Sequence, residues 1–168
     1  MYFEKFPLYE YDITANQNRT LITDILRRVN LKANVRANTL VFDEYNVQDG
    51  DTPDIVATKY YENPEYHWII VTINNIRNRH DWPMDQVALS NYVEDKYTNP
   101  DAAHHYELAQ TSGDTTILLT VASDTVGATA VTNYEYEQTL NDKKRRIRLL
   151  DRGYVAQFRN EFEKLIQR

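Results

Sequence analysis

The sequence predicts an α+β fold, in which a strand-helix-helix core carries an N-terminal extended arm, a β-hairpin insert and a C-terminal amphipathic helix. Two helix-start signals, Thr52-Pro53 and Asn63-Pro64, follow each other closely, and a capping side chain before proline is typical of a first helical turn. Apolar and polar residues alternate over 31–41, whereas one apolar stripe at helical spacing ends the chain. Strands and helices are therefore both expected.

Residues 1–42 are predicted to form an N-terminal arm and a strand. Residues 1–19 combine aromatic side chains with a proline and show no periodicity, which indicates an extended segment. Apolar residues at helical spacing over 21–29 predict a short helix, and the alternation over 31–41 predicts a half-buried strand. Because so short an arm has no core of its own, we expect its aromatic side chains to pack on the body or on another chain.

Residues 43–80 contain the predicted core, which consists of a strand, a tight turn and two short helices. Gly50 supplies a turn conformation that other residues resist, and the Thr52 hydroxyl is expected to cap the first helix. The second helix begins at Asn63-Pro64 and buries one stripe of apolar side chains. That stripe is predicted to consist of Tyr66, Ile69, Ile70 and Ile73, with Trp68 at its margin.

Three segments follow the core. Residues 81–110 predict a helix, opened by Asp81-Trp82-Pro83, and a short strand. Residues 111–140 are rich in Thr, Ala, Val, Ser and Gly and predict a β-hairpin insert, with an alternating strand over 132–137. Residues 141–168 predict a basic strand and a C-terminal helix, whose apolar stripe requires a groove in which to lie.

Composition limits the classes of protein to which the chain can belong. Its 168 residues contain no cysteine, which excludes a disulfide framework and a thiolate metal site. No apolar run approaches the roughly 20 residues that a membrane span requires, and the first residues lack the basic and apolar regions of a signal peptide. We therefore expect the protein to be made and kept soluble, with no membrane partner.

The net charge of −6 conceals an uneven distribution along the chain. Residues 143–168 hold nine Lys or Arg against three Asp or Glu, while the remaining 142 residues hold ten against twenty-two. Two interpretations stay open: the basic end is the solvated face of an amphipathic tail, or it docks on an acidic surface of the chain or of a neighbour. No nucleic-acid partner is expected, because the acidic bulk of the chain would repel phosphates.

No residue pattern indicates catalysis or cofactor binding. Four histidines are present, but none has metal-ligand spacing with a carboxylate, and the adjacent His104 and His105 are expected to point to opposite faces of a strand. The chain has no Gly-x-Ser-x-Gly motif, no glycine-rich phosphate loop and no cysteine nucleophile. We therefore expect no enzyme activity, no catalytic or metal-binding residues, no cofactor and no small-molecule substrate.

Aromatic and basic residues near both ends of the chain indicate contacts with other proteins. The thirteen tyrosines are informative, since tyrosine buries a large area while it keeps a polar tip, which suits interfaces. For any single tyrosine, an ordinary core or surface position explains the residue as well as an interface does. The predicted partner interface consists of Phe3, Phe6, Leu8, Tyr9, Tyr11, Tyr134, Tyr136, Arg145, Arg146, Arg148, Phe158 and Phe162.

The core segment resembles the LysM fold, a small module of two helices and two strands. The motif residues that carry this resemblance are Asp49, Gly50, Asp51, Thr52, Asn63, Pro64 and Asn74. A sugar-binding LysM module ends with a second strand that pairs with the first and helps to form its glycan groove. Residues 77–83 are charged and open another helix instead, so we expect the scaffold to be retained and the groove to be altered.

The wider sequence resembles the LysM-like baseplate wedge proteins of contractile-tailed phages of the T-even type. The resemblance combines the aromatic arm and the LysM-like segment with later motifs. These motifs are Asp81-Trp82-Pro83, the element from His105 to Glu107, Tyr134 to Glu137, and the basic run from Asn141 to Leu150 before an amphipathic helix.

This resemblance implies a structural virion protein, a wedge component that clamps neighbouring wedge subunits in the tail baseplate and is assembled in the host cytoplasm. Its expected partners are other baseplate wedge proteins and hub proteins. The alternative is a LysM module that binds peptidoglycan or chitin, alone or as an accessory to a cell-wall hydrolase. The altered groove argues against glycan binding.

Overall fold

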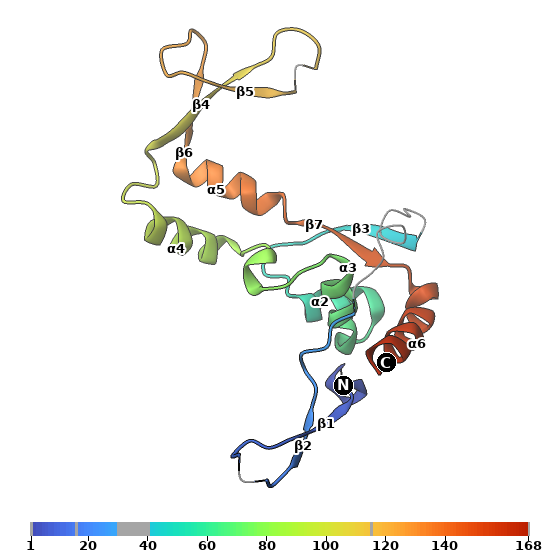
Figure 1. Ribbon diagram of the computed structural model, residues 1–168. Coiled ribbons are helices and arrows are strands. Elements are labelled where there is room, and N and C mark those ends of the chain that lie inside the picture. The colour runs from blue at the N-terminus through green and yellow to red at the C-terminus, as the bar shows by residue number, and fades with distance from the viewer. Residues whose placement is uncertain (1, 16, 30–40, 115, 168) are drawn as a thin grey trace. The chain divides into compact units, whose positions relative to one another are not determined.

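Helices and strands are both present in the structure, a computed structural model that describes residues 2–15, 17–29, 41–114 and 116–167 (Figure 1). The fold is therefore mixed α+β, as the sequence predicts. The chain divides into two compact units. Unit 1 comprises Met1–Asn46, Asp51–Arg77 and Ile147–Arg168, and unit 2 comprises Val47–Gly50 and Asn78–Arg146. In sequence, the larger part of unit 2 is thus an insertion between two parts of unit 1.

Unit 1 combines small two-stranded sheets with short helices. In chain order its described elements are η1 (Tyr2–Lys5), β1 (Leu8–Tyr11), β2 (Thr20–Thr23), β3 (Phe42–Asn46), α2 (Pro53–Tyr61), η3 (Pro64–Tyr66), α3 (His67–Ile73), β7 (Arg146–Leu150), η5 (Arg152–Tyr154) and α6 (Val155–Ile166), where η denotes a 3-10 helix. β1 and β2 are antiparallel, with Leu8 opposite Thr23 and Tyr11 opposite Thr20. The other sheet consists of β3 and β7.

The strands β3 and β7 pair although about a hundred residues separate them in sequence. The Asp151 N–H donates to the Val41 carbonyl at one end (3.0 Å), and the Val47 N–H donates to the Arg145 carbonyl at the other (2.9 Å), so the pair is antiparallel. The second strand that the sequence analysis considered missing after the two helices is therefore present. It comes from the segment predicted as a basic strand, beyond the insertion.

An aromatic and aliphatic core joins the helices of unit 1. The C-terminal helix α6 buries Val155, Phe162 and Ile166, so the groove that its apolar stripe requires belongs to the chain itself. Trp68 was predicted at the margin of α3 but lies in this core, where its ring centroid is 4.5 Å from that of Phe162. The buried core residues are Phe6, Phe42, Trp68, Ile69, Ile73, Leu150, Val155, Phe162 and Ile166.

Unit 2 places two helices beside a three-stranded sheet. Its described elements are η4 (Arg79–Asp81), α4 (Gln86–Lys96), β4 (Ala103–Ala109), β5 (Leu118–Val121), β6 (Thr129–Thr132) and α5 (Asn133–Asp142). Both outer strands are antiparallel to the central strand β4. Leu89 and Val93 of α4 are buried, and α5 buries three polar side chains, Asn133, Glu137 and Asn141.

Two predicted elements are wrong, and a third lies outside the described residues. The helix predicted over 21–29 is absent: Thr20–Thr23 form β2, which pairs with β1, and residues 24–29 form a turn and irregular backbone. The strand predicted over 132–137 is the start of α5, because Thr132 and Glu135 form a reciprocal capping box. The strand predicted over 31–41 falls almost entirely on residues that the structure does not describe.

The predicted arm and insert are also organised differently from the expectation. The arm over residues 1–19 is a short helix followed by a strand of a hairpin, not a single extended segment. In the insert over 111–140, β5 and β6 do not form a hairpin with each other, since each pairs with β4 of the preceding segment. In both cases a neighbour from outside the predicted segment decides the arrangement.

Candidate interaction sites

The motif residues at the turn before α2 shape the turn and form hydrogen bonds to neighbouring elements. Gly50 has a φ of +78°, a left-handed conformation that favours glycine. Asp51 is buried and accepts hydrogen bonds from the Tyr45 hydroxyl (2.8 Å) and the Lys59 ammonium (2.6 Å). Burial, together with this bond to Asp51, raises the pKa of the Tyr45 hydroxyl. Asp51 thus ties a strand to a helix within unit 1.

The two predicted helix caps behave differently. Asn63 caps η3 as predicted, because its side-chain oxygen accepts a hydrogen bond from the Glu65 N–H (2.9 Å) and Pro64 occupies the first position. The Thr52 hydroxyl does not cap α2 but donates to the carboxylate of Asp54 (2.6 Å). That bond lowers the pKa of Asp54.

The side chain of Asn74, at the end of α3, pairs with the edge of strand β7 as a neighbouring strand residue would. Its side-chain amide donates to the carbonyls of Ile70 (2.9 Å) and Arg148 (2.8 Å), and its oxygen accepts from the Arg148 N–H (2.9 Å). The side chain therefore pairs with both backbone groups of one β7 residue. In unit 2, Asp49 accepts from the Gln86 N–H (3.0 Å). Asp49, Asn63 and Asn74 thus bind backbone groups, whereas Asp51 and Thr52 bind side chains.

Three of the predicted interface residues lie in or against the core of unit 1. Phe6 and Phe162 are buried, and Phe158 is half-buried against the same cluster. The Phe158 ring stacks on Trp68 with a centroid distance of 5.8 Å. Phe6 and Phe162 are therefore wrong as residues of an exposed interface, because the N-terminal helix η1 folds onto α6.

A second group of predicted interface residues is exposed on the β1–β2 hairpin. Leu8, Tyr9 and Tyr11 are each more than half exposed, as is Phe3 just before the hairpin. The sequence analysis missed two further exposed apolar residues of this region, Ile13 and Leu21, because they were not recognised as hairpin residues. We define Leu8, Tyr9, Tyr11, Ile13 and Leu21 as the hairpin surface.

The remaining predicted interface residues flank or belong to unit 2. Tyr136 stacks on the ring of His104, with centroids 3.8 Å apart and an interplanar angle of 10°. Arg145 is held within the unit, since it donates to Asp142 (2.9 Å) and to the Val47 carbonyl (3.2 Å). Tyr134 is half-buried, whereas Arg146 and Arg148 are exposed on β7.

The prediction that His104 and His105 point to opposite faces is wrong. Their Nδ1 atoms lie 2.9 Å apart, because the register of β4 against β6 shifts between Ala103 and His105. His105 also contacts the carboxylate of Glu107 (2.9 Å). Within the described residues there is nevertheless no group of three or more His, Asp or Glu side chains that could hold a metal ion.

Unit 2 also exposes apolar residues beside its sheet. Ile117, Leu118 and Leu119 lie at and before β5, an edge strand, and are each close to half exposed. Val126 lies in the following turn and is almost fully exposed. We refer to these four residues as the β5 surface. The composition of the sequence predicted this stretch only as part of the β-hairpin insert.

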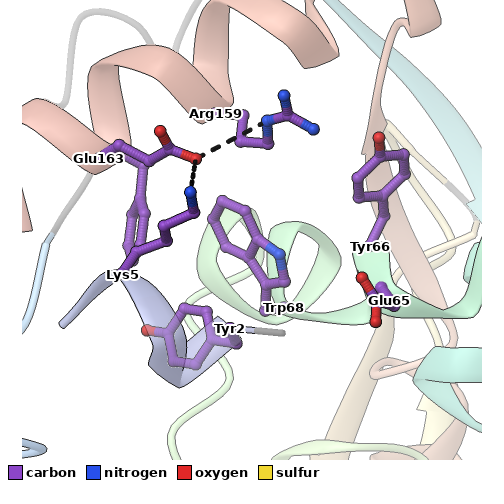
Figure 2. A pocket seen from close by; sticks show the side chains of 8 residues that line it. Tyr2, Lys5, Glu65, Tyr66, Trp68, Arg159 and Glu163 are labelled. Atoms are coloured by element: carbon purple, nitrogen blue, oxygen red, sulfur yellow. Dashed lines mark ion pairs between the residues drawn. The ribbon is translucent and has the colours of Figure 1, made fainter. Parts of the chain in front are cut away.

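A pocket that the sequence analysis did not anticipate lies between η1, α3 and α6 (Figure 2). Its volume is about 240 Å³, and aromatic rings form much of its wall. At its rim, the Glu163 carboxylate lies 3.7 Å from the Lys5 ammonium and 3.8 Å from Nε of Arg159. The lining residues are Tyr2, Lys5, Glu65, Tyr66, Trp68, Arg159, Phe162 and Glu163.

No protein-family model matches the chain, and no curated protein sequence matches it significantly. Within the described ranges, no helix combines the length and the hydropathy that crossing a membrane requires.

Proposed function

We propose that the chain is a structural subunit of a multi-protein assembly, and specifically a baseplate wedge component of a contractile phage tail that clamps neighbouring wedge subunits. The hairpin surface carries this proposal. A two-stranded sheet without a covering layer is marginally stable in water, and contiguous exposed apolar side chains mark contacts with other proteins. Leu8 and Leu21 lie on one face of the hairpin and Tyr9 and Tyr11 on the other, so both faces of this two-stranded sheet expose apolar side chains.

The β5 surface supports the same proposal independently. β5 is an edge strand, so one of its rows of backbone hydrogen-bonding groups has no neighbouring strand among the described residues. The run from Ile117 to Val121 contains none of the charged side chains or prolines with which proteins block edge strands. Two apolar surfaces on two separate compact units suit a subunit that contacts more than one neighbour.

The apolar stripe of the C-terminal helix does not contact a partner in this proposal, although the sequence suggested such a contact. α6 buries that stripe in unit 1, so it needs no partner in order to be ordered. The expected contacts therefore fall on the hairpin surface and the β5 surface.

Limited proteolysis of the isolated chain tests the proposal. We expect early cleavage between residues 8 and 26 and between 111 and 128, and late cleavage within α6, as read by mass spectrometry. Co-expression with the neighbouring wedge proteins should protect the first two regions. Equal resistance of all three regions in the isolated chain would contradict the proposal.

A pull-down with co-expressed wedge proteins provides the matched variants. Leu8→Ser with Leu21→Ser should abolish co-purification, whereas Leu165→Ser, an exposed position on α6, should not. Retention of the isolated chain on insoluble peptidoglycan or chitin would instead support the alternative of a glycan-binding module.

A further inference from the structure

We propose that the pocket of Figure 2 and a second pocket beside it form one groove along α6 that binds an extended, carboxylate-bearing segment of a partner protein. The second pocket has a volume of about 280 Å³ and shares Tyr66 and Arg159 with the first. We call the two together the α6 groove. This inference rests on the proposed function, since it assigns a kind of partner to a chain that acts through partners.

The indole N–H of Trp68 is the first observation that indicates a ligand. Trp68 is only 9% exposed, yet its indole nitrogen has no hydrogen-bond acceptor among the described residues. Figure 2 shows this nitrogen on the edge of the ring that faces Tyr66, within the pocket. A buried donor without an acceptor is costly, and an indole N–H can only donate. A ligand that relieves this cost must supply an acceptor oxygen at this position.

Two guanidinium groups define the charge of that ligand. Arg159 contacts Glu163 only through Nε, and its terminal nitrogens form no ion pair among the described residues. Arg152 lines the second pocket, where its single ion pair in the described part of the chain, with Glu62, is exposed. Among the residues that the structure describes, no carboxylate lines the second pocket. Guanidinium groups bind carboxylates through two parallel hydrogen bonds, so a carboxylate fits between these arginines.

The carboxylates of the first pocket restrict where the acidic group binds. Glu163 is neutralised by Lys5 and Arg159, whereas Glu65 lies on another part of the wall. A ligand carboxylate beside Glu65 would be repelled. We therefore place the ligand carboxylate on the Arg159 and Arg152 side, and an apolar ligand group against the aromatic rings of the first pocket.

The size of the two pockets favours a peptide segment. Each pocket has room for about one side chain, and in an extended chain alternate side chains point to the same face roughly 7 Å apart. An aromatic or aliphatic residue followed two positions later by Asp or Glu would fill the first pocket and reach the arginines of the second. A main-chain carbonyl of the same segment supplies the acceptor for Trp68.

Titration of the isolated chain with two blocked tetrapeptides tests this assignment by NMR. The probe is acetyl-Ala-Phe-Ala-Asp-amide, and its matched control replaces the aspartate with asparagine. The readout is the indole N–H signal of Trp68, which is assigned by comparison with Trp82→Phe, since the chain has two tryptophans. We expect a saturable shift with the acidic peptide and at least about tenfold weaker binding of its control.

Variants of two residues on α6 separate a specific site from a general charge effect. Arg159→Gln should weaken binding of the acidic peptide about tenfold. Lys164→Gln removes the same charge on the same helix, but Lys164 pairs with Glu161 and does not line either pocket, so binding should be unchanged.

Three outcomes would overturn the inference. These are no shift of the Trp68 signal at roughly 10 mM acidic peptide, equal binding of both peptides, or a shift with a chitin oligosaccharide in place of the peptide. The experiment uses neither the hairpin surface nor the wedge proteins. Its failure therefore leaves the proteolysis and pull-down results intact, and failure of those tests leaves the peptide result intact.

Discussion

The interiors of the two units differ in chemistry. Unit 1 buries aromatic and aliphatic side chains from both ends of the chain, around Trp68 and Ile69. Unit 2 buries few large apolar side chains, and its helix α5 instead buries Glu137 and Asn141, which are hydrogen-bonded. The stability of unit 1 therefore depends mainly on the apolar area that it buries. The stability of unit 2 depends more on whether its buried polar groups are all hydrogen-bonded.

The largest effect is expected from a cavity in unit 1. Ile69 is fully buried in the core cluster, so Ile69→Ala should lower the free energy of unfolding by about 2–5 kcal/mol. Urea unfolding followed by Trp68 fluorescence in a Trp82→Phe background reports on unit 1. Ile55→Ala, at a partly exposed position on α2, is the control and should cost less than half as much. Equal losses would show that burial does not set the stability of this unit.

Removal of one polar partner should affect unit 2 nearly as strongly. The buried carboxylate of Glu137 accepts hydrogen bonds from Lys96 (2.7 Å) and from the Tyr97 hydroxyl (2.8 Å). Lys96→Met leaves it with Tyr97 alone, and we expect a loss of about 1–3 kcal/mol in urea unfolding followed by the NMR signal of the Trp82 indole N–H, which is separate from that of Trp68. A change below about 0.5 kcal/mol would mean that water replaces the ammonium at no cost.

The same pair should make unit 2 sensitive to acid. Burial tends to raise the pKa of Glu137, but the hydrogen bonds from Lys96 and Tyr97 outweigh burial, so the pKa lies below its usual value of 4.5. A depressed folded-state pKa gives stability that is complete above the unfolded-state pKa and is lost as the pH falls through the folded-state pKa. Unit 2 should therefore lose stability below about pH 4.5, and Glu137→Gln should reduce this pH dependence in unfolding curves.

Two asparagines provide a direct comparison between the units. Asn74 binds the N–H and the carbonyl of Arg148 in unit 1, and Asn141 binds the N–H and the carbonyl of Met84 in unit 2 (2.8 and 2.9 Å). Alanine at either position leaves these backbone groups without the side chain, at a cost of about 1–2 kcal/mol each in chemical denaturation. If Asn141→Ala costs no more than an exposed substitution, the view that unit 2 depends on its polar contacts is wrong.

The smallest effect on the isolated chain is expected at the hairpin surface. Leu21 is largely exposed, so Leu21→Ser should change the free energy of unfolding by less than about 0.5 kcal/mol. The melting temperature should therefore shift little. Differential scanning calorimetry of the single variant measures this directly. A marked loss of stability would mean that the hairpin packs on its own chain, which would weaken the proposed partner role.

Local signals in the sequence were sufficient where neighbouring residues decide the structure. The cap at Asn63, the proline after it and the buried isoleucines of α3 were predicted, because each depends on residues within one or two helical turns, whereas Tyr66 is only half-buried and Trp68 is buried. The stripe of α6 was predicted for the same reason. The sequence did not predict that this stripe packs in the core of unit 1. The residues of η1 and α3 that contact it are distant from α6 in sequence.

The sequence-based predictions were wrong for two reasons: two local patterns competed for the same residues, or contacts between residues distant in sequence decided the structure. Residues 132–137 alternate as a strand would, but the capping box of Thr132 with Glu135 starts a helix there. The shifted register beside Ala103 brings two histidines to one side, and no spacing rule predicts such a shift. The first pocket of the α6 groove combines Tyr2 and Lys5 of η1 with Trp68 of α3 and with residues of α6, so no single stretch of sequence contains it.

The pairing of β3 with β7 also has a consequence for biosynthesis. The ribosome must translate all of unit 2 between these strands, so β3 emerges long before the residues that complete its sheet. Contacts between such distant residues form late, because a long loop must first close. Nascent chains that end before Leu150 therefore leave the edge of β3 without its complete partner strand β7.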